Sequence, residues 1–292
     1  MMFILAVFIL LFAAVIINWT ANRFIFRPVR KEWPLRLPWE QATFNTQDGS
    51  PLHALYLPAK ENKETLLFFH GKAGNVTYFE DFAKTYAKYG YGILLFDYRG
   101  YGKSKGRLTE AHMYQDGAAA LGYLLKEKMI PAQKIVVWGY SLGNGPAVQT
   151  AVDFNILPLK AVILQSPFTN TAHMASYILL RRYRHGNWLQ KWVSAIFSPI
   201  FFNKKFDNLG KIRRIKAPLL IAYSRQDIVI PWQMSCALAD KAPRGARRYF
   251  SPRGEHEQFA WMEKAAVNFL SPGTFAPKTN NHRTQKTPAF KK

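Results

Sequence analysis

The chain has 292 residues, of which 49% are hydrophobic, and it carries 40 Lys and Arg against 18 Asp and Glu. This length suits one large domain with an extensive core. The net charge of +22 points to an anionic partner. Because no nucleic-acid-binding motif accompanies the charge, we expect an anionic membrane surface rather than a nucleic acid. The single cysteine, Cys236, excludes an intramolecular disulfide and is compatible with a reducing compartment.

The first 22 residues contain no charged side chain, and residues 3–17 are almost wholly apolar. About 20 apolar residues in a helix span the core of a bilayer. A signal peptide has basic residues before its apolar core, whereas here they follow it. We therefore predict an uncleaved single-pass membrane anchor at residues 1–22 and a basic juxtamembrane linker at residues 23–39. The charge bias places the following domain in the cytoplasm; a cleaved signal peptide and a buried helix are the alternatives.

Short apolar segments recur along the rest of the chain. Asp48-Gly49 lies between two weakly alternating segments, residues 42–45 and 52–57, and predicts a β-hairpin. Continuous apolar runs then follow at residues 66–69, 93–96, 135–138, 161–164 and 219–223, with a shorter candidate strand at 247–250.

Helices are expected between these strands, for example at residues 78–89 and 111–128. Buried strands that alternate with helices predict a mostly parallel sheet of about eight strands, with helices on both faces. We expect this domain to span residues 40–270. The basic tail of residues 271–292 has no acidic residue, and it is expected to be disordered.

Residues 139–143 read Gly-Tyr-Ser-Leu-Gly, directly after a predicted strand and before residues 144–149, which can open a helix. G-x-S-x-G between a strand and a helix is the nucleophile elbow. Its strained turn lifts the serine hydroxyl above the sheet, and only glycine tolerates the crowding on either side. The pentapeptide alone is weak evidence, because such a pattern also arises by chance. The prediction therefore rests on its position between a strand and a helix. We predict that Ser141 is a nucleophile; a buried structural serine is the alternative.

A serine attacks poorly at its usual pKa, so the elbow requires a base and an orienting acid. In proteins with this elbow the chain order is Ser, then Asp or Glu, then His. Asp227 lies in the loop after the strand of residues 219–223 and is the predicted acid, with turn capping as its alternative. Among the histidines after Asp227, His282 lies in the polar tail. His256, in the loop after residues 247–250, is therefore the predicted base.

Acyl transfer passes through a tetrahedral oxyanion, and each N–H donor aimed at it contributes about 3–4 kcal/mol. One donor is expected to be the backbone N–H of Leu142, the residue after the nucleophile. The other is expected from the loop that begins at His70, whose imidazole is expected to brace the loop. Gly71 allows a sharp turn that would aim the amide of Lys72 at the site. The sequence leaves Lys72 and Ala73 open as this second donor.

These motifs together resemble the α/β-hydrolase superfamily. More narrowly, they are similar to membrane-anchored, single-domain hydrolases of the bud-emergence-suppressor type, which are relatives of depalmitoylating α/β-hydrolases. The resemblance covers about residues 40–270 and implies an α/β-hydrolase fold and a serine hydrolase, without identifying a substrate. Lys72 departs from the pattern, since these proteins often carry Asn there, and it brings a cation near the site. The resemblance rests on residues 70–75, 96–106 and 139–143, on Asp227 with Pro231-Trp232, and on Gly254-Glu255-His256.

The segment of residues 169–214 is longer than a connection between two strands needs. The resemblance implies that it forms a small helical cap over the serine, after the sixth strand. Its aromatic and aliphatic side chains, among them Trp188, Trp192 and Phe197, would accept an acyl chain, and its basic side chains would face lipid head groups. Ordinary helices packed on the sheet are the alternative.

The sequence therefore predicts a membrane-anchored serine hydrolase that cleaves a carboxylic ester or thioester through an acyl-enzyme. The expected substrate is a small-molecule or lipid-like acyl compound, and no cofactor or metal site is implied. A serine peptidase of the same fold and a catalytically idle, membrane-tethered scaffold are the alternatives. The predicted catalytic residues are Ser141, Asp227 and His256, and the predicted oxyanion hole involves Leu142, Lys72 and Gly71.

Overall fold

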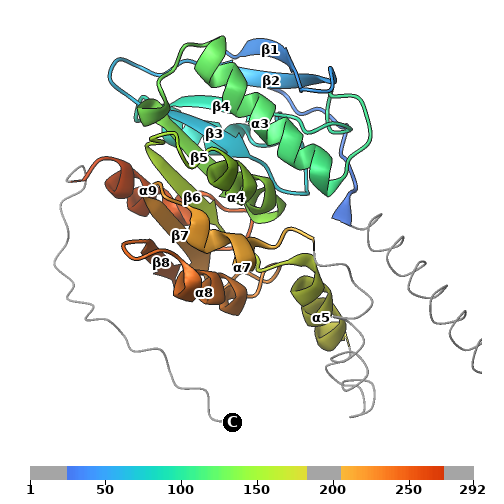
Figure 1. Ribbon diagram of the computed structural model, residues 1–292, viewed down its shortest axis with the longest axis vertical. Helices are drawn as coiled ribbons and strands as arrows, with labels where there is room; N and C mark the ends of the chain where they lie inside the picture. The colour runs from blue at the N-terminus through green and yellow to red at the C-terminus, as the bar shows by residue number, and fades with distance from the viewer. Residues whose placement is uncertain (1–24, 183–204, 273–292) are drawn as a thin grey trace, which may run out of the picture.

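The structure of the chain is a computed structural model, and it describes residues 25–182 and 205–272 (Figure 1). The predicted anchor at residues 1–22 lies outside the described residues. So do the middle of the predicted cap, residues 183–204, and the tail from residue 273. Within the two described ranges, none of the helices combines the length and the apolar character that crossing a bilayer requires.

Eight strands form one sheet: β1 (Glu40–Asn45), β2 (Pro51–Leu57), β3 (Thr65–Phe69), β4 (Gly92–Phe96), β5 (Ile135–Tyr140), β6 (Ala161–Gln165), β7 (Leu219–Ser224) and β8 (Arg247–Ser251). Their order across the sheet is β1-β2-β4-β3-β5-β6-β7-β8 (Figure 1). β2 pairs antiparallel with both β1 and β4, and all other neighbouring strands are parallel. The predicted sheet of about eight strands, mostly parallel with an antiparallel start, is confirmed.

Helices cover both faces of the sheet, and the buried apolar side chains form one core on each face (Figure 1). One face carries α3 (Glu110–Lys126), α4 (Asn144–Asp153), α7 (Asn208–Lys211) and α8 (Trp232–Lys241), and the other carries α2 (Glu80–Ala87) and α9 (Glu263–Leu270). α5 (Thr171–Arg182) extends away from these layers (Figure 1). Short 3-10 turns are η1 (Ala132–Lys134), η2 (Ser141–Gly143), η3 (Ile212–Arg214) and η4 (Ala260–Met262).

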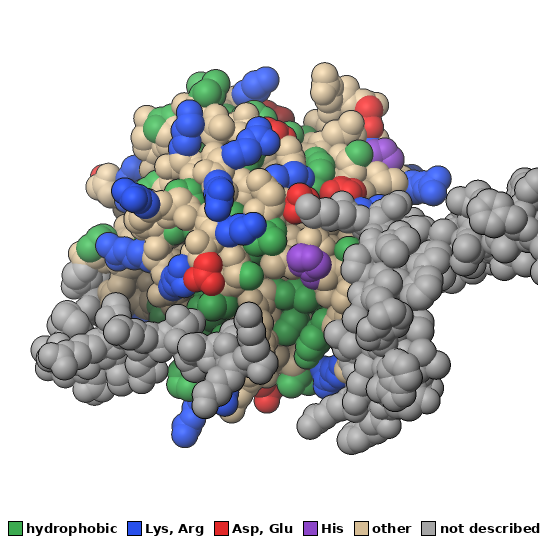
Figure 2. Space-filling model, turned by 60° about the horizontal axis from the view of Figure 1, so that its bottom comes forward, with side chains coloured by type: hydrophobic (Ala, Val, Ile, Leu, Met, Phe, Trp, Pro, Cys, Tyr) green, Lys and Arg blue, Asp and Glu red, His purple; other side chains and the backbone are tan. Residues whose placement is uncertain are grey.

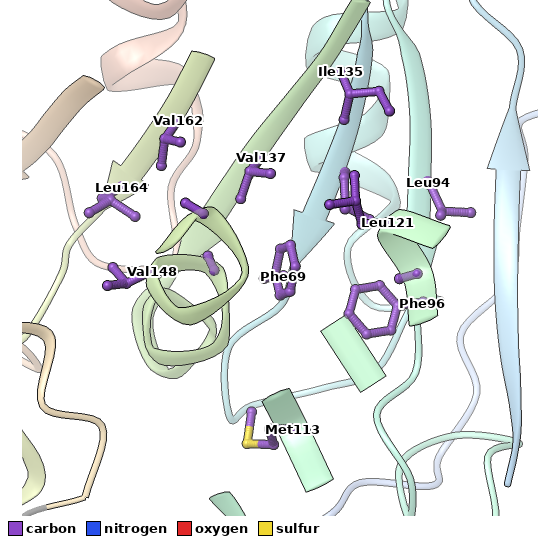
Figure 3. Close-up of a cluster of buried hydrophobic side chains, with 14 of the residues drawn as sticks. Phe69, Leu94, Phe96, Met113, Leu121, Ile135, Val137, Val148, Val162 and Leu164 are labelled. Carbon is purple, nitrogen blue, oxygen red and sulfur yellow. The ribbon is translucent and has the colours of Figure 1, made fainter. Parts of the chain in front are cut away.

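Side chains along the central strands alternate between the two cores. In β3, Leu67 and Phe69 belong to the core under α3 and α4, whereas Leu66 and Phe68 belong to the core under α2 and α9. Figure 3 shows part of the first core, with Phe69 and Val148 among the side chains that fill it. Every residue of β3, β4, β5 and β6 is buried. This is why these strands are continuous apolar runs in the sequence.

The two helices predicted by residue range are present with shifted ends. The helix expected at residues 78–89 is α2, and the chain turns after it at Gly90, where φ is +86°. Glycine favours this left-handed conformation after a helix. The helix expected at residues 111–128 is α3, which begins after Thr109. The Thr109 hydroxyl caps it by accepting a hydrogen bond from the N–H of His112 at 3.1 Å.

Residues 25–39, most of the predicted juxtamembrane linker, lie against the domain and are called here the N-terminal strap. The side-chain amide of Asn75 donates to the carbonyl oxygen of Lys31 at 2.7 Å. The N–H of Trp33 donates to Oγ1 of Thr77 at 2.9 Å. The strap is therefore attached to the segment after β3, in which a donor to the oxyanion is expected.

Glu80, the first residue of α2, binds the strap through its carboxylate. The residue is 4% exposed, it accepts hydrogen bonds from the N–H groups of Arg36 and Leu37, and it pairs with Lys84 at 3.0 Å. Burial disfavours the charge, but these bonds outweigh burial and lower the pKa of Glu80 to about 2 from a usual value of 4.5. The ionised carboxylate thus stabilises the folded state above pH 4.5, and this contribution is lost as the pH falls towards 2.

We predict that Glu80→Gln lowers the free energy of unfolding at pH 7 by about 1–2 kcal/mol, because charge-assisted hydrogen bonds become neutral ones. The difference from the unmodified protein should shrink as the pH is lowered from 4.5 to about 2. Urea unfolding at several pH values measures both effects. The control is Asp81→Asn, next in sequence with a side chain 87% exposed, which should cost less than about 0.5 kcal/mol. Equal losses in the two variants, or a difference that does not change with pH, would contradict this account.

Candidate active site

The predicted site residues lie in four loops that follow parallel strands. Ser141 follows β5, Asp227 follows β7, His256 follows β8, and Gly71 lies in the loop after β3. Parallel strands end at the same edge of a sheet, so the loops after them gather there. The fold therefore brings residues far apart in the sequence to one place.

Ser141 lies at the sharp turn between β5 and α4. Its φ is +52°, in the left-handed region that is strained for a residue with a side chain. The two neighbouring glycines permit close backbone contacts. A Cβ at Gly143 would overlap the carbonyl oxygen of Phe69, and a Cβ at Gly139 would lie 2.8 Å from Cα of Asn144. The strained serine is thus held between two positions that admit only glycine.

His256 connects the serine to the acid. Its Nε2 lies 2.9 Å from Oγ of Ser141, and its Nδ1 lies 2.8 Å from Oδ2 of Asp227. An ionised carboxylate can only accept, so the bond to Asp227 places a proton on Nδ1 and leaves Nε2 to accept from the serine hydroxyl. The hydroxyl of Tyr140 donates to the carbonyl oxygen of His256 at 3.0 Å. The residue before the serine therefore also fixes the loop of the histidine.

Asp227 uses both of its carboxylate oxygens. Oδ2 faces His256, and Oδ1 accepts hydrogen bonds from the N–H groups of Val229 at 2.9 Å and Ile230 at 2.8 Å. Burial disfavours the charge, but the hydrogen bonds from His256 and Ile230 outweigh it and hold the pKa of Asp227 below its usual value. The carboxylate is therefore ionised at neutral pH. Asp227 both contacts His256 and caps its own turn. The two interpretations of this residue from the sequence, an orienting acid and a turn cap, are therefore compatible.

The loop after β3 packs directly on the elbow. A Cβ at Gly71 would lie 3.2 Å from Cβ of Ser141, so the peptide group between Gly71 and Lys72 is next to the serine. Leu142 follows the serine in η2. Lys72 is half-buried, and burial, together with the positive charge of Arg27, lowers the pKa of its ammonium group. The residues predicted for the oxyanion hole thus lie beside Ser141.

Three side chains that hold these loops were not identified from the sequence. They are Tyr140, described above, Asn144 and Gln226. The amide of Asn144 donates to the carbonyl oxygen of Ser141 at 2.8 Å, and Oε1 of Gln226 accepts from the N–H of Gly254 at 3.1 Å. Tyr140 and Asn144 lie within or next to the pentapeptide, which was the available signal. No sequence pattern marks Gln226, because its partner becomes a neighbour only in the folded chain.

A second His–Asp pair lies outside this hydrogen-bonded chain. Nδ1 of His53 is 3.1 Å from Oδ2 of Asp97, and Oδ1 of Asp97 accepts from the N–H of Val76 at 3.0 Å. This pair therefore supports the segment after β3. Among the described residues, no group of three or more His, Cys, Asp or Glu side chains could hold a metal ion.

The segment after β6 leaves and rejoins the domain at one place. The N–H of Thr171 donates to the carbonyl oxygen of Lys205 at 3.0 Å, and the N–H of Lys205 donates to Oγ1 of Thr171 at 2.8 Å. Near the end of α5, Nη1 of Arg181 donates to the carbonyl oxygen of Ile228 at 2.6 Å. The first helix of the predicted cap thus contacts the loop that carries Asp227. Trp188, Trp192 and Phe197 lie outside the described residues.

Comparison with known proteins gives a family and several relatives. A family described as having an alpha/beta hydrolase fold matches residues 64–200. YfhR of Escherichia coli K12 is 27% identical over 263 residues, which cover 85% of this chain and 84% of YfhR. Protein bem46 of Schizosaccharomyces pombe is 28% identical over 208 residues, covering 70% and 65% of the two chains. The lysophosphatidylserine lipase ABHD12 of Danio rerio is 30% identical over 230 residues, covering 73% and 58%.

Solved structures show a similar fold. The esterase Pf2001 of Pyrococcus furiosus superposes with a TM-score of 0.66 at 16% identity, covering 83% of this chain and 95% of the esterase. At this identity the likeness concerns the fold alone. It confirms the fold expected from the sequence, and the match to bem46 confirms the similarity to hydrolases of the bud-emergence-suppressor type.

Proposed function

We propose that this chain is a serine hydrolase of the α/β-hydrolase superfamily, as its similarity to that family and to bem46 and ABHD12 supports, and that it cleaves lipophilic carboxylic esters or thioesters through Ser141, His256 and Asp227. One observation carries the proposal. It is the continuous hydrogen-bonded chain from Asp227 through His256 to Ser141, with distances of 2.8 and 2.9 Å. Residue types, chain order and geometry meet the requirements of nucleophilic catalysis together.

The reaction begins with proton transfer from Ser141 to His256. Nε2 takes the proton as Oγ attacks the acyl carbon, and Asp227 holds the tautomer and stabilises the imidazolium that forms. When the tetrahedral intermediate collapses, the imidazolium gives its proton to the departing alcohol or thiol. The acyl group is then bound to Ser141. A water molecule, deprotonated by His256, attacks this acyl-enzyme, releases the acid and restores the serine.

The carbonyl oxygen of the substrate becomes negatively charged in this intermediate. We assign its donors to the backbone N–H groups of Leu142 and Lys72, each of which would contribute about 3–4 kcal/mol. The position of Gly71, whose Cβ would lie 3.2 Å from Cβ of Ser141, supports Lys72 as the second donor. The half-buried ammonium of Lys72 places a positive charge on the same loop.

A lipophilic acyl part is supported by apolar side chains around the acid. Ile228 is 67% exposed and Val229 is 46% exposed, directly after Asp227, and Ile178 of α5 is 43% exposed. The relative whose name describes a lysophosphatidylserine lipase also favours an acyl lipid over a peptide.

We predict that Ser141→Ala and His256→Ala each lower kcat for p-nitrophenyl butyrate by at least about a thousandfold while the fold is kept. Asp227→Asn should cost less if its main role is orientation. A fluorophosphonate probe should label the unmodified protein and not Ser141→Ala, which also distinguishes the enzyme from an idle scaffold. The control is His112→Ala, which removes a histidine of α3 outside the site. Turnover by Ser141→Ala close to that of the unmodified protein would refute the mechanism.

Chain-length dependence is the second prediction from this site. Across p-nitrophenyl esters from acetyl to decanoyl, kcat/KM should rise by up to about fourfold for each CH₂, about 0.8 kcal/mol, until the pocket is full. Ile228→Asn should reduce this gain and leave acetyl turnover unchanged. The matched control is Ile156→Asn, at an isoleucine that is 84% exposed. A profile that falls steadily from acetyl would exclude a lipophilic acyl site and favour a small-ester or peptide substrate.

We further propose that residues 1–22 anchor the protein in a membrane, with the catalytic domain on the cytoplasmic side. The apolar stretch and the basic residues after it support this. The ring of Phe26 in the strap already packs on Phe206, with centroids 6.0 Å apart. Phe26 is four residue steps beyond the end of the anchor, which span at most about 14 Å, so the domain would lie close to the bilayer. Lys and Arg side chains spread over the face in Figure 2 would then be attracted to anionic lipids.

We expect the full chain to fractionate with membranes and to resist carbonate extraction. A chain that starts at Ile25 should be soluble and active. A chain that starts at Pro38 lacks most of the strap, including the partners of Asn75 and Thr77, and should unfold at lower urea concentration than the chain from Ile25. Protease added outside intact cells should leave the catalytic domain uncut. Digestion of the domain from outside would reverse the assigned topology.

A further inference from the structure

Three consecutive carbonyl groups of the loop after β3 each accept a hydrogen bond from a buried aromatic side chain. The hydroxyl of Tyr98 donates to the carbonyl oxygen of His70 at 3.3 Å. Nδ1 of His70 donates to the carbonyl oxygen of Gly71 at 2.8 Å. The hydroxyl of Tyr101 donates to the carbonyl oxygen of Lys72 at 3.2 Å. These are the residues that precede and include the expected second oxyanion donor.

The three donors form one buried group, which we call the carbonyl clamp (His70, Tyr98 and Tyr101). The ring of His70 lies 4.4 Å from that of Tyr98 and 4.9 Å from that of Tyr101, measured between centroids. All three side chains are at most 1% exposed. Water has little access to this group and cannot replace a donor that is removed. Loss of one donor would therefore leave a buried carbonyl oxygen without a hydrogen-bond partner.

Because a peptide group is planar, a hydrogen bond that fixes the direction of its C=O also fixes the direction of its N–H. In a trans peptide, the C=O of one residue and the N–H of the next point in opposite directions. The bond from His70 holds the C=O of Gly71 on the side of the clamp, so the N–H of Lys72 points away from it. The bond from Tyr101 acts in the same way on the next peptide and on the N–H of Ala73. On Gly71, the position that a Cβ would occupy faces the elbow, 2.9 Å from the ring of Tyr140 and 3.2 Å from Cβ of Ser141.

We propose that the carbonyl clamp sets the oxyanion hole before substrate binds, by holding the peptide groups of Gly71–Lys72 and Lys72–Ala73 with their N–H groups on the side of Ser141. The inference rests on the proposed function of Ser141. His70, Tyr98 and Tyr101 are positioning residues, since they act through the backbone and do not touch substrate. Donors that are already oriented need no reorganisation when the oxyanion forms, which is why they contribute strongly.

His70 must carry its proton on Nδ1, because a carbonyl oxygen can only accept. Its Nε2 is buried and has no hydrogen-bond partner within residues 25–182 and 205–272. Burial lowers the pKa of His70, and the nearby charge of Asp97 opposes this effect without reversing it. The imidazole is therefore neutral at neutral pH, and its tautomer is fixed by the loop.

Tyr101→Phe tests the clamp, because it removes one hydroxyl and keeps the ring. With p-nitrophenyl butyrate, kcat should fall about tenfold and KM should change by less than about twofold, since the donors act on the transition state. The affinity of a boronic acid, which forms a tetrahedral adduct on serine, should fall by a similar factor. His70→Leu should have a larger effect, and His70→Asn should recover part of it, because an amide can donate to the same carbonyl. Rates are expressed per active site, titrated with a fluorophosphonate, so that unfolded protein does not contribute.

The matched control is Tyr86→Phe. Tyr86 is also fully buried, but it belongs to the core under α2 and α9, and its hydroxyl has no partner among the described residues. This variant should keep the kcat and boronate affinity of the unmodified protein. Unchanged values in Tyr101→Phe would overturn the clamp, and so would a loss of kcat without a loss of boronate affinity. Turnover by Ser141→Ala would instead remove the proposed function, so the two failures can be told apart.

Discussion

The contact between the elbow and the end of β3 leaves no space for a side chain, and the arrangement of the site depends on it. Gly143 lies so close to the carbonyl oxygen of Phe69 that a Cβ there would overlap it. This contact brings the turn after β5 against the loop after β3. As a result, the strained serine and the peptide groups beside Gly71 share one small region, although about seventy residues separate them in the chain.

Buried polar groups then hold the surrounding loops in place. Arg99, which is 3% exposed, donates from Nε to Asp116 at 2.8 Å and from Nη1 to Asp48 at 2.8 Å. These bonds join the loop after β4 to α3 and to the β1–β2 hairpin, and the same loop carries Tyr98 and Tyr101. A buried charge is tolerated only when its partners satisfy it. The positions of Tyr98 and Tyr101 in the folded chain are therefore coupled to the ion pairs of Arg99, which lies on the same loop.

Much of the fold could be predicted because the central strands are buried on both faces and are therefore continuous apolar runs. The expected chain order, and the expected position of each residue in a loop after a strand, leave few candidates for the nucleophile, acid and base. This is why the sequence could select Ser141, Asp227 and His256. The role of His70 in bracing its loop was expected from the sequence, but Tyr140, Asn144, Tyr98 and Tyr101 could not be identified in their roles, because these roles come from contacts across the fold. Tyr140 and His256, for example, are 116 residues apart. The strap was expected as a linker, because its basic residues dominate the pattern while its contacts are mainly backbone hydrogen bonds to Asn75, Thr77 and Glu80.

The proposed mechanism requires that Ser141 becomes acylated during turnover. The most direct measurement is mass spectrometry of protein quenched in acid while it turns over p-nitrophenyl butyrate, followed by peptide mapping. A butyryl adduct is expected on the peptide that contains Ser141, present during turnover and lost when substrate is exhausted. An adduct on another residue, or steady turnover in Ser141→Ala at the rate of the unmodified protein, would contradict this mechanism.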